Sequence, residues 1–249
     1  MAEELALNTV HEGDCLELMR DIPDGSIDLV VTDPPYLMDY RSNRRVKTEK
    51  FRHIANDKDA HQLISDYIDE CYRVLADNTA IYMFCSWHHI DFFKSELERH
   101  FKLKNVIVWN KNNHGSGDLK GAYAPKHEFI LYGHKGRSLF REKRVPDVMD
   151  FAKIASKKLT HPTEKPTELL DVFIRNSSDA GDVVFDGFAG TGSTGISALR
   201  NKRSFIGCEL DAEYHALANQ RISDVYYAIY KAPSPPASPF SPKTNAPAG

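Results

Sequence analysis

The sequence has no long apolar run and few cysteines. No stretch approaches the roughly 20 apolar residues that a membrane span needs, and the opening MAEELALNTVHEGD lacks the basic and then apolar pattern of a secretory signal. The four cysteines are scattered and form no CxxC pair, so neither a disulfide framework nor a zinc centre is expected. A reducing cytoplasm is therefore the expected setting.

Two signatures of other protein classes are also missing. No GK[ST] follows the glycine-rich segment at 187–195, which excludes the usual P-loop. The histidines show no HxH or HExxH spacing, so no metal site is expected.

What the chain does have is a composition suited to one globular domain and an uneven distribution of charge. Of its 249 residues, 41% are hydrophobic and 27% are charged, and the net charge is −3. Segment 41–53 nevertheless holds six basic residues and one acidic, and segment 135–160 holds eight basic and three acidic. Two basic segments on an acidic body predict binding of a polyanion through one face, with solvated charged loops as the alternative.

Apolar segments alternate with helical periodicity along most of the chain, which predicts a mostly parallel sheet covered on both faces. Strands are expected at 27–31, 80–84, 106–109, 129–132, 183–185 and 204–207. Helices are expected at 15–20, 61–75, 89–100, 168–177, 193–200 and 212–227. We expect a domain over residues 1–230, a small basic insertion at 137–160 that could read the target, and a disordered Pro/Ser-rich tail at 231–249.

A glycine-rich turn follows the strand at 183–185. Glycines at 187, 190, 192 and 195 allow the backbone to approach a ligand closely, and the following helix N-terminus favours a negative group. Glu209 lies 23 residues after Asp186, where nucleoside-binding βαβ units carry a ribose-binding carboxylate. Proteins that bind NAD, FAD or S-adenosylmethionine share such turns, so the pattern indicates a nucleoside ligand without choosing among them; a tight turn without a ligand is the alternative.

The strand at 27–31 leads directly into Asp33-Pro34-Pro35-Tyr36, at a strand end where open α/β sheets bind ligands. An exocyclic amine on an aromatic base is a poor nucleophile because its lone pair is delocalised into the ring. The Asp33 carboxylate and a main-chain carbonyl of the proline turn can accept both amine hydrogens, and proline keeps those acceptors in a rigid frame. Tyr36 can stack on an extruded base. A plain turn made of Asp and Pro is the alternative.

Together the two motifs resemble the amino-methyltransferases that act on DNA. Asp33 precedes Asp186 by 153 residues, and this order resembles the circularly permuted β class of DNA adenine-N6 and cytosine-N4 methyltransferases. Methyltransferases of release-factor glutamine or ribosomal RNA usually carry the cofactor turn first, followed by Asn-Pro-Pro-Tyr. The resemblance covers about residues 8–228. It implies a doubly wound, Rossmann-like fold with a mostly parallel seven-stranded sheet, and S-adenosylmethionine as the methyl donor.

The resemblance also implies roles for individual residues. It assigns the catalytic turn to Asp33, Pro34, Pro35 and Tyr36, and cofactor contacts to Asp14, Thr163, Lys165, Asp186, Phe188, Gly190, Gly192 and Glu209. Asp14 corresponds to a contact with the cofactor adenine, Thr163 and Lys165 to the methionine end, and Glu209 to the ribose. His127-Glu128-Phe129 resembles the start of the strand that borders the target-base pocket. The chain departs from many relatives by having Gly187 where they have proline, in an Asp-Pro-Phe turn.

The implied reaction is direct methyl transfer to adenine N6 in DNA. No cysteine follows a proline, so the covalent route of cytosine-C5 enzymes is not expected. Adenine is favoured because Ser-Pro-Pro-Tyr marks many cytosine-N4 enzymes; cytosine N4 is the alternative, and RNA or protein glutamine is less favoured.

DNA is the expected partner, held through phosphate contacts that position the enzyme. These contacts are expected from Arg41, Arg44, Arg45, Lys47, Arg141, Lys143 and Arg144. Segment 137–160 is small, which predicts a short or relaxed target sequence. The sequence leaves a homodimer open. We expect a bacterial or phage-encoded cytoplasmic enzyme that associates with the nucleoid and not with a membrane.

Overall fold

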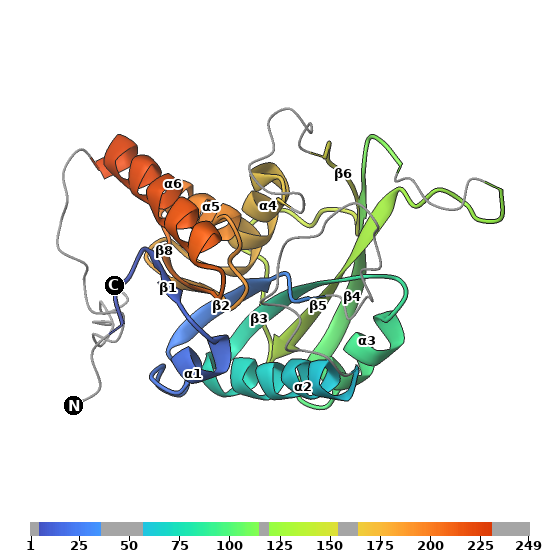
Figure 1. The fold of residues 1–249 in the computed structure, drawn as a ribbon, viewed down its shortest axis with the longest axis horizontal. Coiled ribbons are helices and arrows are strands. Elements are labelled where there is room, and N and C mark those ends of the chain that lie inside the picture. The colour runs from blue at the N-terminus through green and yellow to red at the C-terminus, as the bar shows by residue number, and fades with distance from the viewer. Residues whose placement is uncertain (1–4, 36–56, 115–119, 154–163, 231–249) are drawn as a thin grey trace.

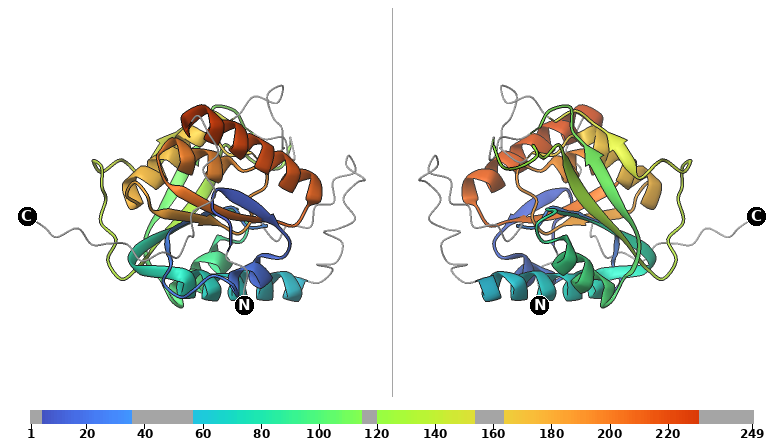
Figure 2. Two further views of the ribbon diagram at one scale, coloured as in Figure 1. Left: turned by 90° about the vertical axis from the view of Figure 1, so that its left-hand side faces the viewer. Right: turned by 90° about the vertical axis from the view of Figure 1, so that its right-hand side faces the viewer.

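A computed structural model describes residues 5–35, 57–114, 120–153 and 164–230. In these ranges one sheet of eight strands lies between two layers of helices (Figures 1 and 2). The strands are β1 (Thr9–Glu12), β2 (Ile27–Thr32), β3 (Leu75–Cys85), β4 (Lys102–Asn110), β5 (His127–Lys135), β6 (Val148–Asp150), β7 (Val183–Asp186) and β8 (Ser204–Glu209). The helices are α1 (Cys15–Met19), α2 (Asp57–Val74), α3 (Ile90–Glu98), α4 (Thr167–Ser177), α5 (Ser193–Arg200) and α6 (Ala212–Tyr230).

The predicted fold class is confirmed, with one strand more than the seven expected among the described residues. The strand order is β1-β8-β7-β2-β3-β5-β4-β6, and β5 is antiparallel to both of its neighbours while the other pairs are parallel. The additional strand, β6, lies inside the segment that was expected to be an insertion, and it pairs with β4 at the edge of the sheet. Three residues with one buried side chain are too short to show a strand period.

Alternate residues of the central strands supply two separate cores. Val30 and Ile81 face one layer, formed by α1, α2 and α3, whereas Leu29 and Val31 face the other, formed by α4, α5 and α6. Strands that are covered on both faces need apolar side chains on both, which explains the continuous apolar runs in the sequence.

β7 and β2 are parallel neighbours in the sheet, and from them the chain adds later strands toward opposite sides. From β7 the chain continues through α5 to β8 on one side, and from β2 it continues through α2 to β3 on the other. Open α/β sheets bind ligands at such a switch point, outside the carboxyl ends of the strands. Asp186 ends β7 and Asp33 follows β2, so the two motifs meet at this point.

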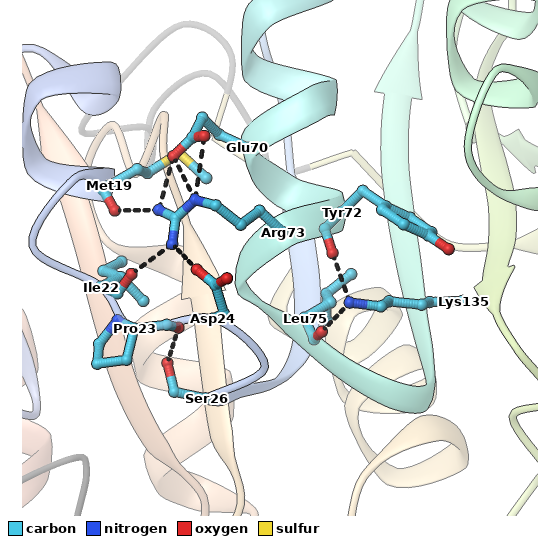
Figure 3. Close-up of polar contacts among 10 residues, drawn as sticks. All are labelled: Met19, Ile22, Pro23, Asp24, Ser26, Glu70, Tyr72, Arg73, Leu75 and Lys135. Carbon is cyan, nitrogen blue, oxygen red and sulfur yellow. Dashed lines mark hydrogen bonds and ion pairs between the residues drawn. The ribbon is translucent and has the colours of Figure 1, made fainter.

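Helix α2 is held at its C-terminal end by two basic side chains (Figure 3). Arg73 donates to the carbonyls of Met19 and Ile22 at 2.6 and 2.8 Å, which ties α2 to α1. Lys135 of β5 donates to the carbonyls of Tyr72 and Leu75 at 2.8 and 2.7 Å. The Lys135 bonds satisfy carbonyls at and just after the end of α2 and fix the helix against the sheet.

Among the described residues, no helix has both the length and the apolar character that crossing a bilayer requires.

Candidate active site

A cavity of about 510 Å³ opens at the switch point. Asp33 and Pro35 line it from the end of β2, Asp186 from β7 and Glu209 from β8. The cavity size is within the range that small-molecule and cofactor sites occupy. The sequence motifs at 33–35, 186–190 and 209 are therefore brought together, although they are spread over most of the chain.

A chain of alternating charges, partly buried and with Lys165 buried at its centre, runs from Asp33 into the sheet. The ammonium of Lys165 lies 2.6 Å from Oδ2 of Asp33 and 3.1 Å from Oε2 of Glu128. Glu128 also forms an ion pair with Lys111. Lys165 is 7% exposed, so these charges interact with little screening by water.

The pairing governs the protonation of both central groups. Burial alone would lower the pKa of Lys165, but the carboxylates of Asp33 and Glu128 raise it above its ordinary value. Burial alone would raise the pKa of Glu128, but the ammonium groups of Lys165 and Lys111 lower it to about 2. Lys165 therefore stays protonated beside the carboxylate of Asp33.

Lys165 was expected to contact the methionine end of the cofactor. It does line the cavity, but its ammonium lies between Asp33 and Glu128, 4.8 Å from the centre of the Phe84 ring. The contact with Asp33 was not visible in the sequence, because 132 residues separate the two. Glu128 had been placed only at the border of the base pocket, and Lys111 carried no sequence signal.

The glycine-rich turn that follows β7 is organised by Asp186. Its carboxylate accepts hydrogen bonds from the Phe188 amide at 3.1 Å and from the Thr194 hydroxyl at 2.8 Å. Burial raises the pKa of Asp186 to about 7, although these hydrogen bonds oppose the shift. Gly190 and Gly192 have φ angles of 53° and 80°, which glycine adopts without strain.

Glu209 and Asp14 complete the cavity on the side of β8 and β1. Glu209 accepts from the Gly190 amide at 2.9 Å and from the Asp211 amide at 2.8 Å, so the turn and the carboxylate are fixed to each other. Asp14 caps α1 by accepting from the Leu16 amide at 2.8 Å, and it also lines the cavity. Two carboxylates beside an open glycine turn fit the hydroxyl and amine groups of a nucleoside cofactor.

A buried tyrosine that the sequence did not single out joins the two motifs. Tyr67 of α2 donates to the Thr32 hydroxyl at 3.0 Å and accepts from the Gly187 amide at 3.1 Å. Its position within α2 reads as an ordinary core position, so only the tertiary contact reveals it.

Several expected site residues lie outside the described residues. These are Tyr36, Arg41, Arg44, Arg45, Lys47 and Thr163, together with the tail at 231–249. Their assigned roles stay predictions.

Within the described part of segment 137–160, Arg141, Lys143 and Arg144 do not line the cavity. Arg141 forms an ion pair with Asp179 at 3.2 Å. Asp179 lies just before the start of β7, whereas Asp33 follows the carboxyl end of the parallel strand β2, so Arg141 is at the opposite ends of the strands. Arg144 lines a separate cavity of about 330 Å³ against Phe173 of α4. Lys143, between them, is exposed. The sequence could not show this, because β5 runs antiparallel and carries the chain away from the catalytic edge.

A family model described as DNA methylase, of the N6/N4 type, matches residues 27–220 of this chain. The chain belongs to the N6/N4 DNA methylase family. Among relatives, YubD of Escherichia coli (strain K12), named as a methylase, is 32% identical over 220 residues, which cover 88% of this chain and 91% of YubD. The DNA adenine methyltransferase YhdJ of the same organism is 28% identical over 252 residues, covering 86% of this chain and 82% of YhdJ.

Solved structures agree with this methylase in fold. The M1.HpyAVI–SAM complex superposes with a TM-score of 0.66 at 24% identity, covering 86% of this chain and 98% of that one. The cytosine-N4-specific PvuII DNA methyltransferase gives a TM-score of 0.68 at 18% identity, covering 91% and 95%. S-adenosylmethionine is the methyl donor of this methylase, and DNA is its substrate.

Proposed function

We propose that this methylase transfers the methyl group to N6 of adenine in DNA, with Asp33 as the residue that receives the amine. The observation that carries the proposal is the position of Asp33 and Pro35 in the wall of the cavity that also contains the glycine turn and Glu209. An amine presented at Asp33 would face a donor held by Asp186, Phe188, Gly190 and Glu209.

The residues at the end of β2 would hold the amine for attack. Asp33 and a main-chain carbonyl of the proline turn accept its two hydrogens, which directs the nitrogen lone pair toward the donor. The bound donor supplies an electrophilic methyl group on a sulfonium centre. The nitrogen–carbon bond forms as the carbon–sulfur bond breaks, and the surplus proton on nitrogen leaves to Asp33 or to water. Alignment of the two groups supplies much of the rate.

The choice of adenine rests on the acidic first residue of the turn and on one relative. Asp33 occupies the position where many cytosine-N4 enzymes have serine, and YhdJ is named as an adenine methyltransferase. The likeness to the cytosine-N4-specific PvuII enzyme is a likeness of fold, at 18% identity. Cytosine N4 is accordingly the second candidate.

We infer that DNA approaches the carboxyl edge of the sheet. Large exposed side chains occur in the connections at this edge: Trp87, 53% exposed, directly after β3, and Tyr123, fully exposed, between β4 and β5. Lys120 and Lys126 are exposed in the same β4–β5 connection. Aromatic faces stack on unpaired bases, and lysines contact phosphates. We leave Arg141 out of this proposed DNA-binding surface, because it pairs with Asp179 at the opposite ends of the strands.

The test is transfer of tritiated methyl groups to duplex DNA, RNA and protein in parallel, followed by nucleoside analysis of the DNA. We expect label in DNA as N6-methyladenine, and Asp33→Asn should lower kcat by about 10²-fold or more while donor binding is retained. Asp77→Asn is the control, because Asp77 is an exposed carboxylate with a side-chain exposure of 86%. Label in N4-methylcytosine, or full activity of Asp33→Asn, would contradict the proposal.

A further inference from the structure

Tyr67 lies between the cofactor turn and the catalytic strand and is fully buried. Its hydroxyl donates to Thr32, the residue before Asp33, and accepts from the amide of Gly187, the residue after Asp186. Burial raises the pKa of Tyr67 well above its ordinary value, so the hydroxyl keeps the proton that it donates. One side chain of α2 therefore bonds to the neighbours of both key aspartates.

The hydrogen bonds of Tyr67 link the ends of two strands. Thr32 at the end of β2 accepts from Tyr67, and the Thr32 hydroxyl also acts to lower the pKa of Asp186 at the end of β7. Gly187 follows Asp186 and donates back to Tyr67. The ends of β2 and β7 are thus joined by side chains beyond the last bonds of the sheet ladder, which pairs Val30 with Phe185.

Gly187 lies where a side chain would collide with the ring of Tyr67. A Cβ atom at Gly187 would lie 2.4 Å from Cε2 of Tyr67 and 2.8 Å from its hydroxyl oxygen. Both distances are shorter than those that Cβ atoms adopt in proteins. Proline would add that carbon and remove the amide that binds the tyrosine. Residues 67 and 187 are therefore matched in size and in hydrogen bonding.

We propose that Tyr67 is a positioning residue that sets the glycine-rich turn relative to Asp33, and that it does so through its close contact and hydrogen bond with Gly187. The tyrosine supplies from α2 the rigidity that glycine lacks, and Arg73 and Lys135 hold α2 in place. The position of the donor relative to the incoming amine then depends on Tyr67, although Tyr67 does not itself line the cavity.

The first experiment removes only the hydroxyl. In Tyr67→Phe, titration calorimetry with S-adenosylmethionine should show about tenfold weaker binding, because the Gly187 amide is left buried without its acceptor. The kcat for methyl transfer to DNA should fall as well. Tyr72→Phe is the matched control, since Tyr72 lies on the same helix and its ring packs on His100 and Phe101. Donor affinity and kcat that are both unchanged in Tyr67→Phe would overturn the proposal, whatever happens to its unfolding temperature.

The second experiment tests the matched pair. Gly187→Pro alone should lose about 100-fold or more in donor affinity, because the ring of Tyr67 occupies the space the proline needs. In Tyr67→Leu/Gly187→Pro that space is free, and binding should recover at least about tenfold over the single variant. Strictly additive effects of the two substitutions would overturn the pairing. Donor binding does not involve the acceptor base, so this result is independent of whether adenine or cytosine is methylated.

Discussion

The buried ammonium of Lys165 lies between two carboxylates at the centre of the site. Taking such charges out of water costs free energy, and the attraction between partners must offset that cost. Removing one partner leaves an uncompensated buried charge, which is more damaging than loss of an exposed pair. Substitution of Lys165 can therefore distinguish two roles. A role beside Asp33 predicts a change in kcat, and a contact with the donor predicts a change in the KM for S-adenosylmethionine.

We predict that Lys165→Met lowers kcat far more than it raises the KM for S-adenosylmethionine. Without the cation, Asp33 and Glu128 repel each other, and the pKa of Glu128 rises from about 2. The acidic limb of the pH–rate profile should consequently move to higher pH. Steady-state kinetics between pH 5 and 9 measure both effects.

The control for this variant is Lys94→Met, because Lys94 is exposed and pairs with Glu98 on the surface of α3. A raised donor KM with an unchanged kcat would contradict the prediction and would favour the contact with the methionine end of the donor that the sequence suggested.

Asp186 gives stability a specific pH dependence. Its pKa is about 7 in the folded protein and near 3.8 in an unfolded chain. The folded protein therefore holds a proton that the unfolded chain has released, and the stability associated with Asp186 is lost as pH rises from about 4 to 7.

We predict that wild-type protein loses about 3 kcal/mol more than Asp186→Asn between pH 5 and pH 8, since each pKa unit is worth about 1.4 kcal/mol. Urea unfolding at both pH values measures the difference. Asp77→Asn, which removes an exposed carboxylate, should follow the wild type. Parallel losses in wild type and Asp186→Asn would show that the aspartate is ionised in the folded protein.

At the scale of elements, the N-cap residue of helix α1, Asp14, is also a predicted cofactor contact. Asp14 has extended backbone angles and accepts from the amides of Leu16 and Glu17, so it stabilises the first turn of the helix. The same carboxylate lines the cavity, where a cofactor contact is predicted. One residue is thus predicted to have two separable functions.

We predict that Asp14→Ala lowers the free energy of unfolding by about 1 kcal/mol, whereas Asp14→Ser, which keeps a capping oxygen, stays within a few tenths. Both should weaken donor binding about tenfold or more, because both lack the carboxylate. Chemical unfolding and calorimetry separate the effects. Wild-type donor affinity in Asp14→Ser would limit Asp14 to capping.

For the whole molecule, the antiparallel direction of β5 carries Arg141 away from the end of the sheet where we propose that DNA binds. Segment 41–53 follows the catalytic turn in sequence, whereas Arg141 lies at the opposite edge and Arg144 at a separate cavity. DNA affinity falls with salt in proportion to the number of phosphates that are contacted.

We predict that Arg44→Ala/Arg45→Ala reduces the slope of log affinity against log salt by about 2, and that Lys143→Ala/Arg144→Ala leaves it nearly unchanged. Fluorescence anisotropy with a labelled duplex at several salt concentrations measures both slopes. Equal reductions in the two variants would place segment 137–160 on the DNA face after all.

Much of the fold was determined by local sequence. The apolar runs and helical periods predicted six strands and six helices near their observed places, because a strand buried on both faces must be continuously apolar. The two motifs were equally readable, since proline and glycine mark turns by their own backbone preferences. β1 and β6 were not singled out, because they are short and partly polar.

The neighbours of those motifs were decided only by the tertiary structure. Asp33 and Asp186 meet because β2 and β7 pair across the switch point. Lys165 reaches Asp33 because it lies just before α4, which packs against β2. The Lys111–Glu128–Lys165 ion pairs and the Tyr67–Gly187 pair join residues between 17 and 120 positions apart. Such contacts depend on the order and direction of strands, which no local pattern of residues encodes.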